Sequence, residues 1–262
     1  MVFVLLGCTL DAGRGFGELT QVTLDADLEP GEARDLGDGA ILTNLAYEVT
    51  PTVATLGLGT VSLLELQGGA GGDSFDPADP PEGYGLCHGG HCHRDDGALV
   101  DYADVEAELA GGGASFAAVA TIPIGQEVDL LGGASLELVP TDPALPAADV
   151  SKLTLGVGTL HIEALVSDGI DGGWPLTVDL ALDGDLAVGF DLALDRDHDP
   201  VVQLALALQP GGTLLDDLDF AALAVEGAVH IADDADPGAE TLAAACLAVE
   251  PTFTIDRQPW SD

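Results

Sequence analysis

Basic residues are scarce in this 262-residue chain: six Lys and Arg stand against 46 Asp and Glu, giving a formal net charge of −40. Nucleic-acid binding depends on clustered Lys and Arg that neutralise phosphates, so this composition excludes a nucleic-acid partner. The same charge repels anionic membrane surfaces, attracts cations and favours solubility. Because salt screens the repulsion among so many carboxylates, we expect a halophilic protein from a saline habitat.

Aromatic residues make up only 5% of the chain, and there is a single Met. No G-x-S-x-G elbow, P-loop, dinucleotide-binding fingerprint or H-E-x-x-H motif occurs in the sequence. Few cations are present to hold a phosphate or a carboxylate, and few aromatic rings to stack on a sugar. No apolar run reaches the length of a membrane-spanning helix. The sequence therefore indicates no reaction class and no catalytic residue.

Hydrophobic residues make up 47% of the chain, which excludes a disordered protein, and 35 Gly with 15 Pro indicate many turns. Apolar residues alternate with small or acidic ones over many short runs, as in strands with one buried face. We predict a mainly β protein, an antiparallel β-sandwich or open barrel with two or three short helices. Residues 21–262 are expected to form a single β-rich domain.

The most regular alternation runs from Leu176 to Leu208. Asp183-Gly184 in the middle of it is a two-residue hairpin signal, and a second turn is expected at residues 195–200. The pattern predicts a three-strand meander with one buried face and one wet face.

Helices are predicted at residues 99–110, where Asp101 can act as the N-cap, at 213–223, and from Asp236-Pro237 to about Val249. Cys246 lies in the apolar run of this last helix, so we expect it to be a buried, inert thiol.

The chain opens with a short apolar run ending in Leu5-Leu6-Gly7-Cys8. This run resembles the lipobox of bacterial lipoproteins, in which the Cys becomes the lipidated first residue of the mature chain. The resemblance implies an exported protein, either an outer-membrane or cell-surface lipoprotein or a periplasmic one. Residues 1–20 would be the tether, and the membrane would be contacted only through a lipid on Cys8. The alternative is a buried first strand with an ordinary Cys.

Residues 68–98 are expected to form one long loop, and five potential metal ligands fall within seven of its positions: Cys87, His88, His91, Cys92 and His93. Loops of this length in a compact domain are often functional. Imidazole and thiolate are the ligands that late first-row metals prefer. A site that uses both thiolates would suit Cu(I) or zinc. Oxidised thiols would leave three His, a set that suits Cu(II) or zinc.

A haem site is an alternative interpretation of the same residues. Cys87, four intervening residues, Cys92 and His93 resemble the rarer expanded attachment motif of some multihaem c-type cytochromes. By that resemblance the two Cys would bind the vinyl groups of haem c, and His93 would be the proximal ligand. The protein would then be an electron-transfer cytochrome.

A third interpretation is structural: a Cys87–Cys92 disulfide closes the loop, which belongs to a surface structural or adhesion module. The other His residues are weaker candidates. His161 and His230 lie on predicted strands and could add a ligand to the cluster, while His198 lies in an acidic turn that lacks the Gly and Glu of a calcium loop. We favour a metal-binding protein of the cell envelope, with copper or zinc at the Cys/His cluster.

Overall fold

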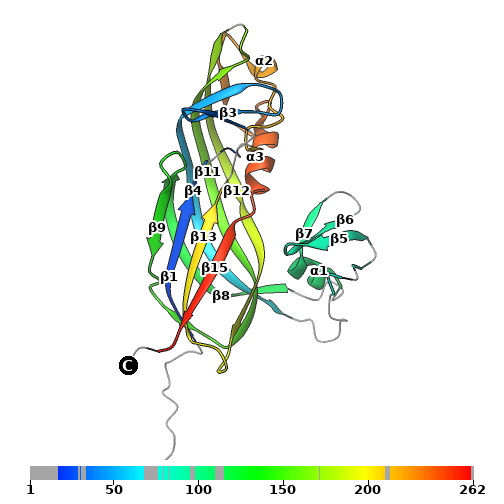
Figure 1. Cartoon of the computed structure of the whole chain (residues 1–262), viewed down its shortest axis with the longest axis vertical. Coiled ribbons are helices and arrows are strands. Elements are labelled where there is room, and N and C mark those ends of the chain that lie inside the picture. Colours follow the sequence, from blue (N-terminus) through cyan, green and yellow to red (C-terminus); the bar gives the residue numbers. More distant parts are fainter. Residues whose placement is uncertain are drawn as a thin grey trace, which may run out of the picture.

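The protein is mainly β and forms a sandwich of two large sheets, with a third, small sheet beside it (Figure 1). This computed structural model describes residues 17–28, 30, 34–67, 76–78, 80–81, 83–94, 98–109, 115–170, 172–209 and 213–260. The lipobox-like Cys8 lies outside the described residues. None of the helices formed by these residues has the length and hydrophobicity of a membrane-spanning segment.

The larger sheet has the strand order β14-β12-β11-β4-β3-β2, and β8 also pairs with β4. Its pairs are antiparallel except for β12 with β14. The strands are β2 (Asp35–Gly37), β3 (Ala40–Leu42), β4 (Glu48–Gln67), β8 (Ser115–Asp129), β11 (Ala148–Ser167), β12 (Gly173–Leu194) and β14 (Val229–Ile231).

The second sheet has the order β10-β1-β13-β15, with β9 also on β1. β1 and β13 run parallel although they come from distant parts of the chain, and the other pairs are antiparallel. The strands are β1 (Gly17–Ala26), β9 (Ala134–Leu138), β10 (Ala144–Leu145), β13 (Val201–Leu208) and β15 (Thr252–Gln258).

One hydrophobic core lies between these two sheets. It is built from the inward positions of alternating strands, such as Leu24 of β1, Leu63 of β4 and Leu204 of β13, all nearly inaccessible to solvent. Because side chains alternate between the two faces of a strand, the acidic and small residues of the same strands face outward. The predicted sandwich is thus confirmed, and the strand order leaves each sheet open.

The predicted hairpin at Asp183-Gly184 is wrong: β12 runs through these residues as one continuous strand. In a two-residue hairpin the residues that flank the turn face the same side, so a buried Leu182 would require a buried Asp185. Asp185 is instead exposed, and the buried positions continue at Leu186. Buried and exposed positions thus keep alternating across the Asp-Gly pair, as they do in an uninterrupted strand. β13 then joins the other sheet, so the three-strand meander does not form.

Gly184 has a packing role. A Cβ at this position would lie 2.6 Å from Leu247 Cδ2 on the helix α3 (Ala239–Leu247), so a larger residue would force the Leu247 side chain to move. β4 likewise runs through Pro51 and residues 57–59 as one strand, with register shifts against its neighbours.

The helices are shorter than predicted. α1 (Tyr102–Leu109) begins directly after the expected cap Asp101, because the residues before it form a strand. α2 (Phe220–Leu223) is a single turn whose N-cap is Asp219. α3 contains Cys246, which is 2% exposed, and burial raises the pKa of its thiol to about 11. The prediction of a buried thiol is therefore confirmed.

The third sheet consists of β5 (Tyr84–His88), β6 (His91–Arg94) and β7 (Leu99–Asp101) in the order β5-β6-β7. With α1 it forms a small lobe beside the sandwich (Figure 1). Residues 84–94 were expected to be irregular, and this prediction is wrong, because the two-residue turn between the His residues closes a regular hairpin. Residues 68–75, the first part of the predicted loop, lie outside the described residues.

Candidate metal site

The Cys/His cluster lies on the hairpin formed by β5 and β6. Gly89 and Gly90 form its turn, with φ of +60° and +96°. Positive φ at both central residues is the geometry of the tight hairpin turns that match the twist of the strands, and Gly adopts it without steric cost. His88 and His91 therefore stand directly opposite each other on the two strands.

The strand register separates the imidazoles from the sulfurs. Cys87 pairs with Cys92, and the next residue pair along the hairpin is Leu86 with His93. Because side chains alternate between faces, His88, His91 and His93 share one face and the two Cys residues share the other. Hairpin pairing alone thus gathers three His from a run of six residues.

On the sulfur face, Cys87 and Cys92 form a disulfide. Cys92 is fully buried and packs with Val100 of β7 and Val105 of α1, forming the core of the small lobe. The predicted disulfide is confirmed. Its two sulfurs are not thiolates, and they lie on the face opposite the imidazoles, so the three His are the potential metal ligands that the structure brings together.

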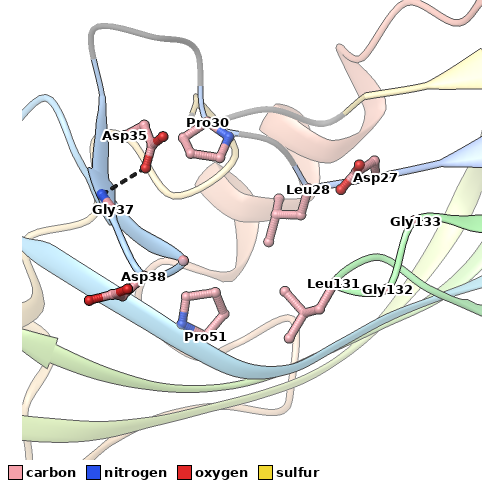
Figure 2. A pocket seen from close by; sticks show the side chains of 11 residues that line it. Asp27, Leu28, Pro30, Asp35, Gly37, Asp38, Pro51, Leu131, Gly132 and Gly133 are labelled. Atoms are coloured by element: carbon pink, nitrogen blue, oxygen red, sulfur yellow. Dashed lines mark hydrogen bonds between the residues drawn. The ribbon is translucent and has the colours of Figure 1, made fainter.

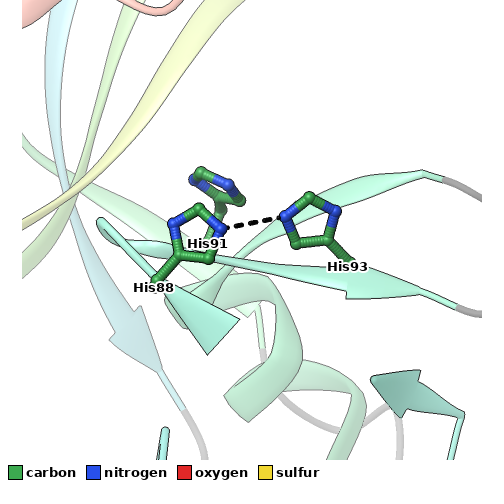
Figure 3. Close-up of side chains that lie close together, drawn as sticks. All are labelled: His88, His91 and His93. Carbon is green, nitrogen blue, oxygen red and sulfur yellow. Dashed lines mark hydrogen bonds between the residues drawn. The ribbon is translucent and has the colours of Figure 1, made fainter. Parts of the chain in front are cut away.

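On the opposite face, one ligand nitrogen from each of His88, His91 and His93 lies within 4.8 Å of the others. His93 Nε2 lies 3.1 Å from His88 Nε2, and the ring centroids are 4.8 to 5.3 Å apart. Figure 3 shows the three rings gathered over one face of the hairpin. Among the described residues, this is the group of His, Cys, Asp and Glu side chains close enough together to hold a metal ion.

The geometry suits a single ion. Zinc–imidazole bonds are about 2.0–2.1 Å long, so two nitrogens on one tetrahedral ion lie about 3.4 Å apart. The 3.1 Å separation of the His88 and His93 nitrogens is already close to that value. The largest separation between two of the three nitrogens is at most 4.8 Å, so it would have to shorten by only about 1.4 Å, which rotation of the side chains allows.

Asp101 flanks the site from the third strand, where it pairs with His91. Burial raises the pKa of its carboxyl group to about 6, with Lys152 opposing this shift and the carboxylates of Asp104 and Glu250 adding to it. Asp101 thus places a carboxyl group beside His91, and an ionised carboxylate there favours a bound cation.

Glu250 reaches the site from the sandwich, in the connection between α3 and β15. Its Oε1 lies 3.7 Å from Nδ1 of His91. That nitrogen is buried and has no hydrogen-bond partner. Sequence reasoning missed both Glu250 and Asp101: nothing in the local pattern around a single Glu far along the chain indicates its proximity to the hairpin.

The lobe is held against the sandwich at several points. Lys152 of β11 donates to both carboxylate oxygens of Asp104 on α1, at 2.9 and 2.8 Å. The backbones of Gly90 in the lobe and Gly189 on β12 also approach closely: a Cβ on Gly189 would lie 3.4 Å from the carbonyl oxygen of Gly90. A cavity of about 490 Å³ lies at this junction and is lined by residues from both parts, including Gly90, Tyr102, Ser151, Phe190 and Phe253.

The other three His residues lie elsewhere. His161 on β11 is paired with Asp179, 2.6 Å away, and His198 with Asp195, 2.8 Å away in the acidic turn. His230 is an exposed residue of β14. None belongs to the metal-ligating group found among the described residues.

A second hollow, of about 600 Å³, lies at another part of the sandwich (Figure 2). Three carboxylates line it: Asp27, Asp35 and Asp38. Asp35 already accepts a hydrogen bond from the backbone of Gly37, 2.8 Å away, and the described residues form no metal-ligating group there.

Comparison with protein-family models, with curated proteins and with solved structures gives no match to this chain. The function has to be inferred from the chemistry of the site.

Proposed function

We propose that this protein binds one copper or zinc ion at the cell envelope, through the imidazoles of His88, His91 and His93. The observation that carries the proposal is the convergence of three imidazole nitrogens within 4.8 Å on one face of a disulfide-closed hairpin. The hairpin register places the three rings on one face, and a single ion there would give all three nitrogens a common partner.

The choice of metal follows from the donor set. Three neutral imidazoles without a thiolate suit Cu(II) and Zn(II), whereas Cu(I) prefers sulfur. Three protein ligands leave a fourth position for water or another small ligand, as in open zinc sites. By the usual order of affinities, Cu(II) binds more tightly than Zn(II).

Two observations support a location at the cell envelope. Disulfides persist in oxidising compartments outside the cytosol, and Cys87 and Cys92 form one. The Leu5-Leu6-Gly7-Cys8 run resembles a lipobox, which implies export and a lipid anchor at Cys8.

The test uses the even division of the six His residues into three in the cluster and three outside it. Full-length protein is titrated with Zn(II) and Cu(II) in high salt, which screens weak binding to the acidic surface. We expect one tight site per chain, lost in H88A/H91A/H93A and kept in H161A/H198A/H230A. Equal binding by the two triple variants would overturn the proposal.

The same preparation separates the two rival functions. Haem attachment needs the two sulfurs that the disulfide uses, so a Soret band and a haem mass that survives denaturation would establish a c-type cytochrome with His93 as ligand. Protein that binds no metal and keeps its disulfide would favour a surface structural or adhesion module, in which the Cys87–Cys92 disulfide serves only to stabilise the hairpin.

A further inference from the structure

One nitrogen of the metal-ligating cluster lacks a partner. His91 Nδ1 is buried and makes no hydrogen bond, although the side chain of Glu250 is only 3.7 Å away. A buried polar nitrogen without a partner is costly. A metal-ligating His normally donates its second N–H to a carboxylate or carbonyl group, which fixes the ring orientation and raises the basicity of the ligand.

We propose that Glu250 is the positioning carboxylate of this site, and that metal binding at His91 fastens the small lobe to the sandwich. This inference rests on the proposed metal site. The ion takes Nε2 of His91, and Nδ1–H then donates to Glu250. A short rotation of the Glu250 side chain, which is about half exposed, closes the gap to hydrogen-bond distance.

The two residues belong to different parts of the molecule. His91 lies on β6 of the lobe, and Glu250 lies between α3 and β15 of the sandwich. A bound cation withdraws electrons from the imidazole ring and makes its N–H a stronger donor, so occupancy strengthens the contact between lobe and sandwich. By thermodynamic linkage, a lobe that is held in place binds the ion more tightly by the same factor.

Asp101 is the competing candidate for the same role, because it lies opposite His91 in the neighbouring strand. It makes no hydrogen bond to the buried nitrogen, however, and it belongs to the lobe itself. A contact from Asp101 would orient the ring without joining the lobe to the sandwich, so the two roles give different results in the experiment below.

The experiment measures zinc affinity of the full chain by competition with a chelator, for wild type, E250A, E250Q and E240A. Glu240 is an exposed residue in the first turn of α3, so E240A removes the same charge away from the site. We expect E250A to weaken zinc binding by roughly 10- to 100-fold, with E250Q in between because it keeps an acceptor, and E240A at the wild-type value. Thermal unfolding of the zinc-free variants checks that the fold is intact.

A second measurement tests the fastening of the lobe. Zinc should slow amide hydrogen exchange in residues 248–253 of the wild type and leave it unchanged in E250A. Wild-type affinity in E250A, or equal zinc protection of these amides in both proteins, would overturn the inference while leaving the three-His site in place. Absence of zinc binding by the wild type itself would instead overturn the proposed function.

Discussion

Lys152 and Asp104 form the ion pair that connects the sandwich to the small lobe: the Nζ atom contacts both carboxylate oxygens, at 2.9 and 2.8 Å. Lys152 is the only lysine of the chain. Its side chain is 13% exposed, and its ammonium group also lies 5.0 Å from the ring centroid of Phe116, within cation–π range. In a protein with so few cations, this one is placed where two parts of the fold meet.

Replacing Lys152 should loosen this connection. We expect Lys152→Met to lower the free energy of unfolding by about 1–2 kcal/mol, between the values for exposed and for buried ion pairs, because Asp104 keeps partial access to water. Urea unfolding of K152M, D104N and the double variant measures the coupling between the two side chains. Additive effects of the two single changes would show that the pair contributes nothing of its own.

The stability of the metal-free protein should depend on the ionisation of Asp101. Its folded-state pKa of about 6 lies above the ordinary value of 3.8. The folded protein therefore binds this proton more tightly than the unfolded chain does. The resulting stabilisation is complete below about pH 4 and is lost as the pH rises through about 6.

Asp101→Asn cannot ionise, so its stability relative to wild type should be higher at pH 7 than at pH 4. Thermal unfolding in the presence of a chelator, at a series of pH values, measures the difference. Glu240→Gln, which removes an exposed charge, is the control. The prediction fails if D101N and wild type show parallel pH profiles.

The disulfide should contribute to metal binding without contacting the metal, because it holds the two strands that carry the imidazoles. In the chain-entropy picture, opening a ring of this size in C87S/C92S costs about 2 kcal/mol of stability. We expect zinc affinity to fall as well, since the His residues lose their fixed positions. Chelator competition before and after treatment with a reductant measures the effect in the wild type. Tighter zinc binding after reduction would mean that the thiolates are ligands.

Gly184 should be needed for the contact between β12 and α3. A methyl group at this position would lie 2.6 Å from Leu247 Cδ2, so Gly184→Ala displaces that flexible side chain and should destabilise the protein by at most about 1 kcal/mol. Leu247→Ala removes the obstructing atoms, and G184A should cost less in that background. Gly158→Ala on β11 is the control, because a Cβ there would meet only the carbonyl oxygen of Gly57, at an ordinary contact distance of 4.0 Å. Equal costs of G184A in both backgrounds would contradict the packing role.

Local sequence patterns were sufficient for the fold class and for the three His of the candidate site, but not for Asp101 and Glu250 beside them. The alternation of apolar residues indicated a sandwich, and the density of ligands indicated the segment that carries the Cys/His cluster, although not its hairpin structure. The sequence also shows that the alternation of apolar residues continues unchanged across Asp183-Gly184, which predicts a continuous strand. It likewise contains the two-residue turn Gly89-Gly90, which predicts that the three imidazoles share one face. At Asp183-Gly184 the phase of the flanking residues decides against the turn signal, and at Gly89-Gly90 the turn makes a hairpin of residues expected to form a loop.

Long-range pairing could not be predicted in the same way. The parallel alignment of β1 with β13 and the approach of Glu250 to His91 depend on how distant segments pack, and no local pattern carries that information. The placement of Asp101 beside His91 likewise required the register between β6 and β7.

The register of the second sheet also places the two ends of the β-structure at one pole of the molecule. Glu18 near the start of β1 and Gln258 at the end of β15 both pair with Val201, so only one strand separates them, a span of about 10 Å. A fusion partner or surface attached at either end would meet the sandwich at that same pole. β4 and β11 are twenty residues long, which corresponds to about 65 Å of strand. The opposite end of the sandwich therefore lies about that far from such an attachment.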